Sequence, residues 1–298
     1  MIRFRNNISI NGEAFGRARA MAAGIFEPSG PPSSNPLFRG GAPQLPGQED
    51  YETFVERNAA IYENRVRDLL VRIQTRQAGR AVMSSIGQQA RRVTIVPLPQ
   101  PRQRIATRRT TDSPNSYATP LDLEAATQKS RLLRDARDGE VLKPWRRGTG
   151  EGSDGEIEFH PWPVTPDVLP DQSSCRSQTP FEGSLDEDLL HELLHVLRYM
   201  LGVRNARKVP FQPLYDTMEE FFAIVITNIY RSECGREGIR QHHHEAPASC
   251  ITDEGFLKVG LNREHLRKLR RQQPDLFADL HAVKAPFNPI RQMWVAGQ

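Results

Sequence analysis

Two long apolar patterns dominate the distribution of hydrophobic and polar positions along the chain. Between Tyr51 and Thr75, apolar residues recur at intervals of three and four, which predicts an amphipathic helix. Between residues 184 and 201 the apolar face is so wide that the predicted helix must be largely buried; it includes Leu189, Leu190, Leu193, Leu194, Val196, Leu197 and Met200. A second buried helix is predicted from Asp216 to Gly235. A capping pair is expected at the start of each buried helix, Ser184 with Glu187 and Asp216 with Glu219. Gly202 is placed to end the helix at 184–201.

Shorter patterns predict strands between these helices. The β-branched run at 93–97 ends in a proline, and residues 156–159 alternate polar and apolar side chains. A short helix is expected up to Ile86, an Arg-rich helix from Asn262 and a last helical turn around 274–281. The chain is therefore predicted to have an α+β fold, mainly helical with a small sheet, in which the strand at 156–159 is the edge strand and precedes the helix at 184–201.

Composition divides the chain into an arm and one domain. Residues 1–48 include a stretch rich in Pro, Gly and Ser, which cannot bury much apolar surface, so they are predicted to be disordered. Residues 49–298 are predicted to form the domain. Within it, residues 98–147 are rich in Arg, Thr and Pro and are predicted to be a polar insertion with one short helix near 121–135.

Charge and cysteine content exclude several classes of protein. The formal net charge of +4 is small and dispersed, so neither a nucleic-acid partner nor a membrane partner is expected. Three cysteines cannot all pair and show no CxxC spacing, which argues against a disulfide scaffold. The amino-terminal residues lack the apolar core of a secretory signal peptide, and the longest apolar run, 221–226, is too short to span a bilayer.

The buried helix at 184–201 carries the chemistry that points to a function. His191 and His195 are four residues apart, which stacks their imidazoles on one face of a helix at a separation that one metal ion can bridge. Glu192 lies beside them and is the candidate general base that takes a proton from the attacking water. Polar groups inside an aliphatic helix cost several kcal/mol unless they are satisfied. The HELLH sequence therefore predicts one catalytic Zn²⁺ and a zinc metallopeptidase, with two ordinary core histidines as the alternative.

A catalytic zinc needs a third protein ligand, and the second buried helix supplies two candidates. No histidine follows His195 up to Leu201, which excludes the metzincin continuation. Glu219 and Glu220 both lie at the start of the next helix, and Glu220 is preferred because Glu219 is placed to serve the cap with Asp216. Glu219 stays the alternative.

Three further assignments concern substrate handling. Tyr215 is the first candidate for stabilising the oxyanion, followed by Tyr230 and His243. The strand at 156–159 is expected to hold an extended peptide by β-augmentation. The run 242–244 is interpreted as a solvated histidine tract, with a second metal site as the alternative.

The order of these features resembles the NleD-like zinc peptidases, which are type III secretion effectors of bacteria. The similar elements are the helix at 51–75, a short strand, the Gly-rich turn before 156–159, HELLH and the Glu-Glu-Phe-Phe-Ala segment at 219–223. The resemblance implies a zincin-like fold, one zinc and the cleavage of proteins inside a target cell, where members of that family cut host signalling kinases. It also implies a virulence factor secreted into a host cell without a Sec signal; a cytoplasmic location is the alternative.

The leading hypothesis is therefore a zinc metalloendopeptidase that hydrolyses peptide bonds of a protein substrate. The alternatives are a non-catalytic zinc-binding interaction module and a zinc hydrolase of a small amide or peptide.

Overall fold

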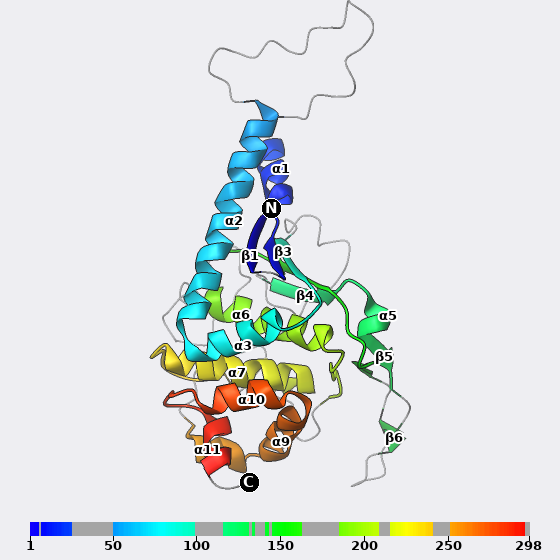
Figure 1. The fold of residues 1–298 in the computed structure, drawn as a ribbon, viewed down its shortest axis with the longest axis vertical. Helices are drawn as coiled ribbons and strands as arrows, with labels where there is room; N and C mark the ends of the chain where they lie inside the picture. The colour runs from blue at the N-terminus through cyan, green and yellow to red at the C-terminus, as the bar shows by residue number, and fades with distance from the viewer. Residues whose placement is uncertain are drawn as a thin grey trace, which may run out of the picture.

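The computed structural model describes residues 1–5, 7–25, 50–98, 116–130, 133–134, 141–142, 145–162, 185–208, 215–240 and 251–295. These residues form an α+β fold that is mainly helical and contains a small mixed sheet. The predicted fold class is confirmed at this level. Figure 1 shows the sheet above a stack of helices, with the long α2 rising along one side.

The main sheet has five strands in the order β1-β2-β3-β9-β4. Their bounds are Ile2–Arg5 (β1), Ile8–Ile10 (β2), Val93–Pro97 (β3), Gly155–Phe159 (β9) and Ser116–Pro120 (β4). The pairs β2–β3 and β3–β9 are parallel, whereas β1–β2 and β9–β4 are antiparallel. Alternate residues of β9 are buried, so one face of the sheet packs on the helices, as the alternating pattern predicts.

The predicted position of the edge strand is wrong. Residues 156–159 do form a strand that precedes the HELLH helix, but this strand lies inside the sheet, between β3 and β4. The strand at that end of the described sheet is β4, where Ala118 pairs with Ile157. It comes from the segment expected to be a polar insertion. The five residues of β4 are mostly small or polar, so their sequence carries no strong strand signal.

The other described residues of the expected insertion also contain more secondary structure than its composition suggests. A single helical turn, α5 (Leu123–Ala126), replaces the helix expected near 121–135. Two small antiparallel pairs of strands follow. β5 (Thr127–Lys129) pairs with β8 (Arg146–Gly148), and β6 (Leu133–Arg134) pairs with β7 (Val141–Leu142). Residues 99–115 lie outside the described part of the chain.

The prediction of a disordered arm over residues 1–48 is wrong for its first half. Three elements lie within it, β1, β2 and α1 (Glu13–Ala22), and α1 packs along α2 (Tyr51–Thr75). Two glycines allow this close contact: a Cβ atom on Gly12 would lie 2.3 Å from the Ala59 carbonyl oxygen, and one on Gly16 would lie 2.2 Å from that of Val55. The Pro/Gly/Ser-rich part, residues 26–49, lies outside the described residues.

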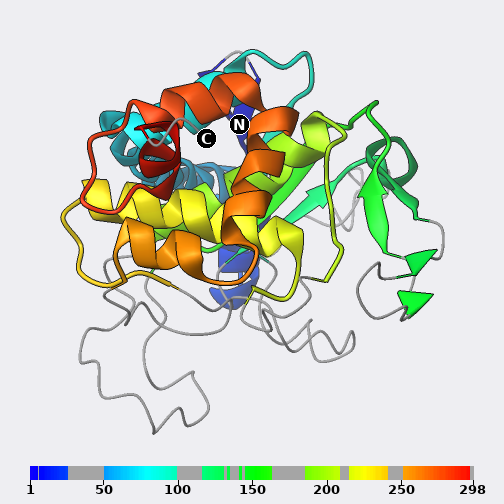
Figure 2. The same ribbon diagram turned by 90° about the horizontal axis from the view of Figure 1, so that it is seen from below.

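The helices below the sheet form successive layers. α3 (Gln77–Gly87) and α6 (Leu185–Met200) lie next to the sheet, and α7 (Met218–Glu233) lies below them (Figure 1). The carboxyl-terminal helices cover the other side of α7 (Figure 2); they are α8 (Asp253–Lys258), α9 (Asn262–Gln272), α10 (Pro274–His281) and α11 (Pro289–Val295). Both α6 and α7 are therefore buried between layers, as their wide apolar faces predict.

The ends of α6 and α7 are set by local signals. Gly202 ends α6 at φ +61°, as predicted. The glycine-rich turn at 148–155 packs on this end, and a Cβ atom on Gly152 would lie 1.9 Å from the Met200 carbonyl oxygen. The predicted cap of α7 is wrong, because Thr217 accepts the hydrogen bond from the Glu220 amide while Asp216 adopts φ +53°. Ser184 lies outside the described residues.

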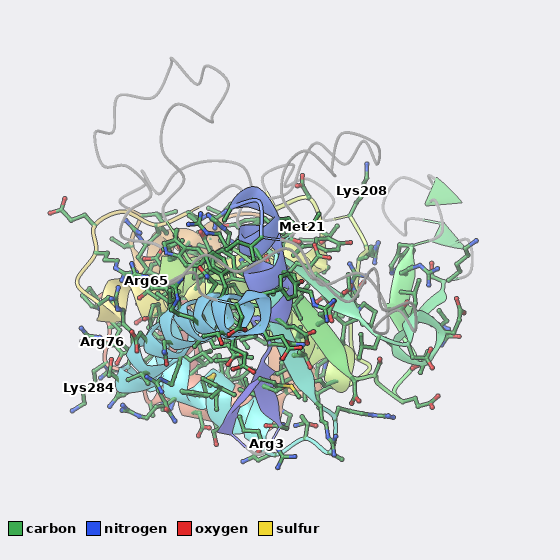
Figure 3. The ribbon with its side chains drawn as sticks, turned by 90° about the horizontal axis from the view of Figure 1, so that it is seen from above. Arg3, Met21, Arg65, Arg76, Lys208 and Lys284 are labelled. Carbon is green, nitrogen blue, oxygen red and sulfur yellow. The ribbon has the colours of Figure 1, made fainter. Side chains whose placement is uncertain are left out.

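Basic side chains are spread over the surface. Arg3, Arg65, Arg76, Lys208 and Lys284 lie at separate places around the outline of the molecule (Figure 3). Within the described residues, no helix combines the length and the apolar character needed to cross a membrane.

Candidate metal centre

Three predicted ligands converge between α6 and α7. His191 and His195 project from successive turns of α6, and Glu220 comes from the first turn of α7. The two Nε2 atoms lie 3.0 Å apart. Glu220 Oε2 lies 3.1 Å from His191 Nε2, and its Oε1 lies 3.4 Å from His195 Nε2. All three ligand atoms lie within 4.8 Å of one another, so the fold brings together residues that are 29 positions apart.

These separations match what a tetrahedral ion requires. Zinc binds imidazole nitrogen and carboxylate oxygen at about 2.0–2.1 Å, so two ligand atoms at a tetrahedral angle are about 3.3 Å apart. The measured separations of 3.0, 3.1 and 3.4 Å lie close to that value. Two imidazoles and one carboxylate form a donor set that catalytic zinc sites use. The residues present therefore fit a zinc ion.

Glu219, the alternative ligand, is held elsewhere. Both of its oxygens bind the Arg198 guanidinium, from Nε to Oε2 at 2.7 Å and from Nη2 to Oε1 at 2.9 Å. Oε1 also accepts a hydrogen bond from the Asn205 amide. Although burial favours the neutral acid, Arg198 holds the pKa of Glu219 below its usual value. Of the two adjacent acids, only Glu220 is turned toward the histidines.

The three converging groups strongly perturb one another. Burial lowers the pKa of His191 to about 4, so this imidazole is neutral, the form that binds a metal. Burial also opposes the charging of His195 and Glu220, but their mutual attraction outweighs it. This attraction raises the pKa of His195 to about 9 and holds that of Glu220 well below its usual range. A bound cation would compete with a proton on His195 for the Glu220 carboxylate.

Glu192 lies beside the cluster, with a partner that sequence reasoning missed. The Ser116 hydroxyl donates to Glu192 Oε1 at 3.2 Å, and both residues are buried. Burial raises the pKa of Glu192 to about 7, against the opposing effects of His195 and the Ser116 hydrogen bond. Ser116 opens β4, so the strand at this end of the described sheet contacts the face of α6 that carries Glu192. Nothing in the composition around Ser116 predicts this contact, since the two residues are 76 positions apart.

The contacts that the structure describes for Tyr215 and Tyr230, two candidates for an oxyanion donor, lie outside this cluster. The Tyr215 ring packs edge-on against Phe221, with a centroid separation of 5.2 Å, as part of the hydrophobic core. The Tyr230 hydroxyl donates to Asp186 at 2.7 Å. His243 and the rest of the tract at 242–244 lie outside the described residues. The catalytic role of Tyr215 stays a prediction.

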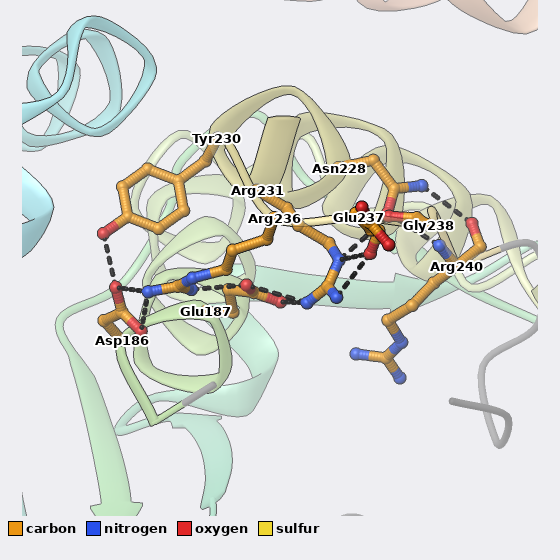
Figure 4. Close-up of polar contacts among 9 residues, drawn as sticks. All are labelled: Asp186, Glu187, Asn228, Tyr230, Arg231, Arg236, Glu237, Gly238 and Arg240. Atoms are coloured by element: carbon orange, nitrogen blue, oxygen red, sulfur yellow. Dashed lines mark hydrogen bonds and ion pairs between the residues drawn. The ribbon is translucent and has the colours of Figure 1, made fainter. Parts of the chain in front are cut away.

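An ion-pair network ties α6 and α7 together (Figure 4). Arg236, just beyond α7, binds Asp186 at 2.8 Å and also binds Glu187, both at the start of α6. Arg231 of α7 binds Glu187 at 3.0 Å. Glu187 thus serves this network rather than the predicted capping box. The two acids are almost fully buried, so their pairing fixes the register between α6 and α7.

Comparisons with known proteins add no identification. No protein-family model matches the chain, and a comparison with curated proteins gives no match.

Proposed function

We propose that this protein is a zinc-dependent metalloendopeptidase with a zincin-like fold. The observation that carries the proposal is the convergence of His191, His195 and Glu220 at tetrahedral spacing, with the Glu192 carboxylate next to them on the same helix. An interaction module that only held a metal would need the three ligands but not a buried acid beside them, since burying such a group is costly.

The residues of the chain divide the chemistry between them. A zinc ion bound by the three ligands would polarise the scissile carbonyl and acidify the attacking water. Glu192 takes the proton from that water and passes it to the leaving amine. Its raised pKa, about 7, suits both halves of this task near neutral pH. Ser116 orients the carboxylate, since its hydroxyl occupies one carboxylate oxygen and leaves the other to the substrate side.

The strand that holds the substrate is β4 in this proposal, not residues 156–159. β4 lies at the end of the described sheet, and its first residue, Ser116, contacts Glu192. A peptide added alongside β4 would extend the sheet and pass beside the catalytic face of α6. This placement favours an extended protein segment over a small amide as substrate. Secretion into a host cell and a host signalling protein as target rest on the resemblance to the NleD-like family alone.

The test compares the purified chain with a Glu192→Gln variant. Bound zinc is measured by elemental analysis, and new peptide termini are sought by mass spectrometry in a eukaryotic lysate treated with each protein. We expect about one zinc per chain in both proteins and new termini for the wild type only. A wild-type chain that binds no zinc, or equal cleavage by both proteins, would falsify the proposal.

A further inference from the structure

Three short segments that are rich in basic residues lie side by side beyond the end of β4. Two of them are β5 and β8, in which Lys129 pairs with Arg146. The third, residues 203–208, runs along the other side of β8; a bridge between Arg147 and Asn205 joins the two, with backbone hydrogen bonds on either side of it. We call these three segments the basic lobe.

Positive charge is concentrated in the basic lobe. Its described residues carry six basic side chains and no carboxylate side chain; the six are Lys129, Arg146, Arg147, Arg204, Arg207 and Lys208. The sequence between β5 and β8, residues 130–145, adds four basic and three acidic residues, so it does not offset this charge. The whole chain has a formal net charge of only +4, which makes the basic lobe a local feature rather than part of a generally basic surface.

Much of this charge is not balanced inside the lobe. Lys129, Arg147 and Lys208 are exposed, and none of them forms an ion pair with another described residue. Lys129 also lies directly opposite Arg146, and like charges in that position of an antiparallel pair are destabilising. Arg146 lies 3.9 Å from Glu124, but the Glu124 side chain is 85% exposed, so this ion pair offsets little. The lobe therefore offers positive charge to a ligand.

The basic lobe continues the strand that is proposed to hold the substrate. β4 begins at Ser116, which contacts Glu192, and ends at Pro120; α5 and β5 follow it directly (Figure 1). Five residues of a strand span about 17 Å. Antiparallel pairing is the more stable kind, and a peptide that pairs with β4 in this way runs from the lobe toward Glu192. It reaches the lobe with residues that precede the scissile bond by about five or more.

We propose that the basic lobe is an exosite that binds an acidic segment of the protein substrate, beginning about five residues before the scissile bond. This inference rests on the proposed peptidase function and adds a property of its substrate. Carboxylates accept hydrogen bonds from both ammonium and guanidinium groups, so Asp and Glu side chains match the lobe. A basic segment at the same place would be repelled.

Two other interpretations make different predictions. A nucleic-acid backbone also matches a positive surface. Continuity with β4 favours a peptide, because one extended chain can pair with β4 and reach the lobe at the same time. A solvated surface without a ligand predicts that the charge of the substrate at this place has no effect.

The experiment uses the full chain with zinc and a peptide that contains one cleavage site found in the treated lysate. The positions five to eight residues before the scissile bond are all Glu, all Gln or all Lys, and kcat and KM are measured for each peptide. At low salt we expect the KM of the Glu peptide to be roughly tenfold below that of the Gln peptide, through several exposed ion pairs of small effect each. The kcat should be equal, because the lobe does not contact the reacting atoms. The difference in KM should shrink in about 0.5 M NaCl, which screens exposed charges.

Substitutions in the lobe test which side chains are responsible. Lys129→Gln, Arg147→Gln and Lys208→Gln, combined in one protein, should remove the preference for the Glu peptide. Replacing the same three residues by Glu should transfer the preference to the Lys peptide. A general loss of structure cannot produce such a reversal.

A matched control is available on the side of the molecule that carries α2, away from β5 (Figure 1). Arg67→Gln, Arg72→Gln and Lys284→Gln remove the same amount of charge from exposed side chains and should leave the three KM values unchanged. Circular dichroism and the zinc content of each variant report whether the fold and the metal centre are intact.

The outcomes separate this inference from the proposed function. No cleavage of any peptide or lysate protein by the zinc-loaded wild type overturns the proposed function, and the exosite with it. Cleavage of the three peptides with equal KM overturns the exosite alone, as does a Glu preference that survives the neutral triple substitution. Binding of a DNA duplex in about 0.15 M salt that the triple substitution abolishes, together with equal KM values, assigns the lobe to nucleic acid and also overturns the exosite.

Discussion

Glu219 and Glu220 are adjacent in the sequence, but Glu219 pairs with Arg198 whereas Glu220 contacts the two histidines. One isosteric substitution at each position tests this difference. Glu219→Gln removes the charge that neutralises Arg198, a side chain that is 1% exposed. The guanidinium keeps its contact with the Val203 carbonyl oxygen at 2.9 Å but loses its counter-ion. Removing one partner of a buried ion pair costs about 3–5 kcal/mol. Because small domains have a total stability of about 5–15 kcal/mol, this is a large fraction of it.

Glu220→Gln should behave differently. The Glu220 side chain is 17% exposed and contacts two imidazoles, which an amide can still meet by hydrogen bonding. We expect the metal-free variant to lose about 1 kcal/mol, the value of a typical hydrogen bond. Its zinc affinity should fall sharply, since a neutral amide is a poor zinc ligand. Glu219→Gln, by contrast, leaves all three ligands in place.

The assay has two readouts for each variant. The free energy of unfolding is measured by guanidinium titration in the presence of a chelator, so that zinc does not contribute. Zinc affinity is then measured by competition with a chromophoric chelator under native conditions. The reasoning is refuted if Glu219→Gln unfolds within 1 kcal/mol of the wild type, or if Glu219→Gln loses zinc while Glu220→Gln keeps it.

Three other predictions follow from the same structure. Ser116→Ala should lower kcat by roughly tenfold without changing zinc affinity, since it removes one hydrogen bond to the Glu192 carboxylate; equal loss of zinc would contradict this role. Burial, with Lys268 and Arg207 nearby, lowers the pKa of His265 from 6.5 to about 4, so below pH 6.5 the unfolded chain binds a proton that the folded chain does not. Stability should therefore fall as the pH drops from 6.5 to 4, by at most ~3 kcal/mol before solvent screening, and His265→Gln should flatten that part of a stability–pH profile. Free zinc at a hundred times its Kd should raise the unfolding free energy by about 2.7 kcal/mol, and calorimetry with and without a chelator measures this shift.

The sequence predicts the local parts of this protein well. The helices at 51–75, 184–201 and 216–235, and the strands at 93–97 and 156–159, are confirmed within a few residues. Each has a periodic apolar pattern that is long enough to be unambiguous or ends in a clear signal such as Gly202. The choice of Glu220 over Glu219 agrees with the observed geometry, although the reason given for Glu219 was wrong: it binds Arg198 rather than capping α7.

The parts that depend on contacts between distant segments could not be predicted. β1 and β2 have four and three residues, too few to show a reliable period. They form strands because β2 pairs with β3 and β1 pairs in turn with β2. β4 is a strand for the same reason, through its pairing with β9. Ser116 became a candidate only when that pairing placed it next to Glu192.

The chain separations within the fold also bear on the order in which it assembles. The packing of α6 on α7 joins His191 to Glu220, which are 29 positions apart. The sheet must join more distant residues: it pairs Ile8 with Val93, and β4 brings Ser116 to Glu192, 76 positions away. Closing longer loops costs more entropy and slows folding. We therefore expect His191, His195 and Glu220 to come together early in folding and the contact between Ser116 and Glu192 to form late.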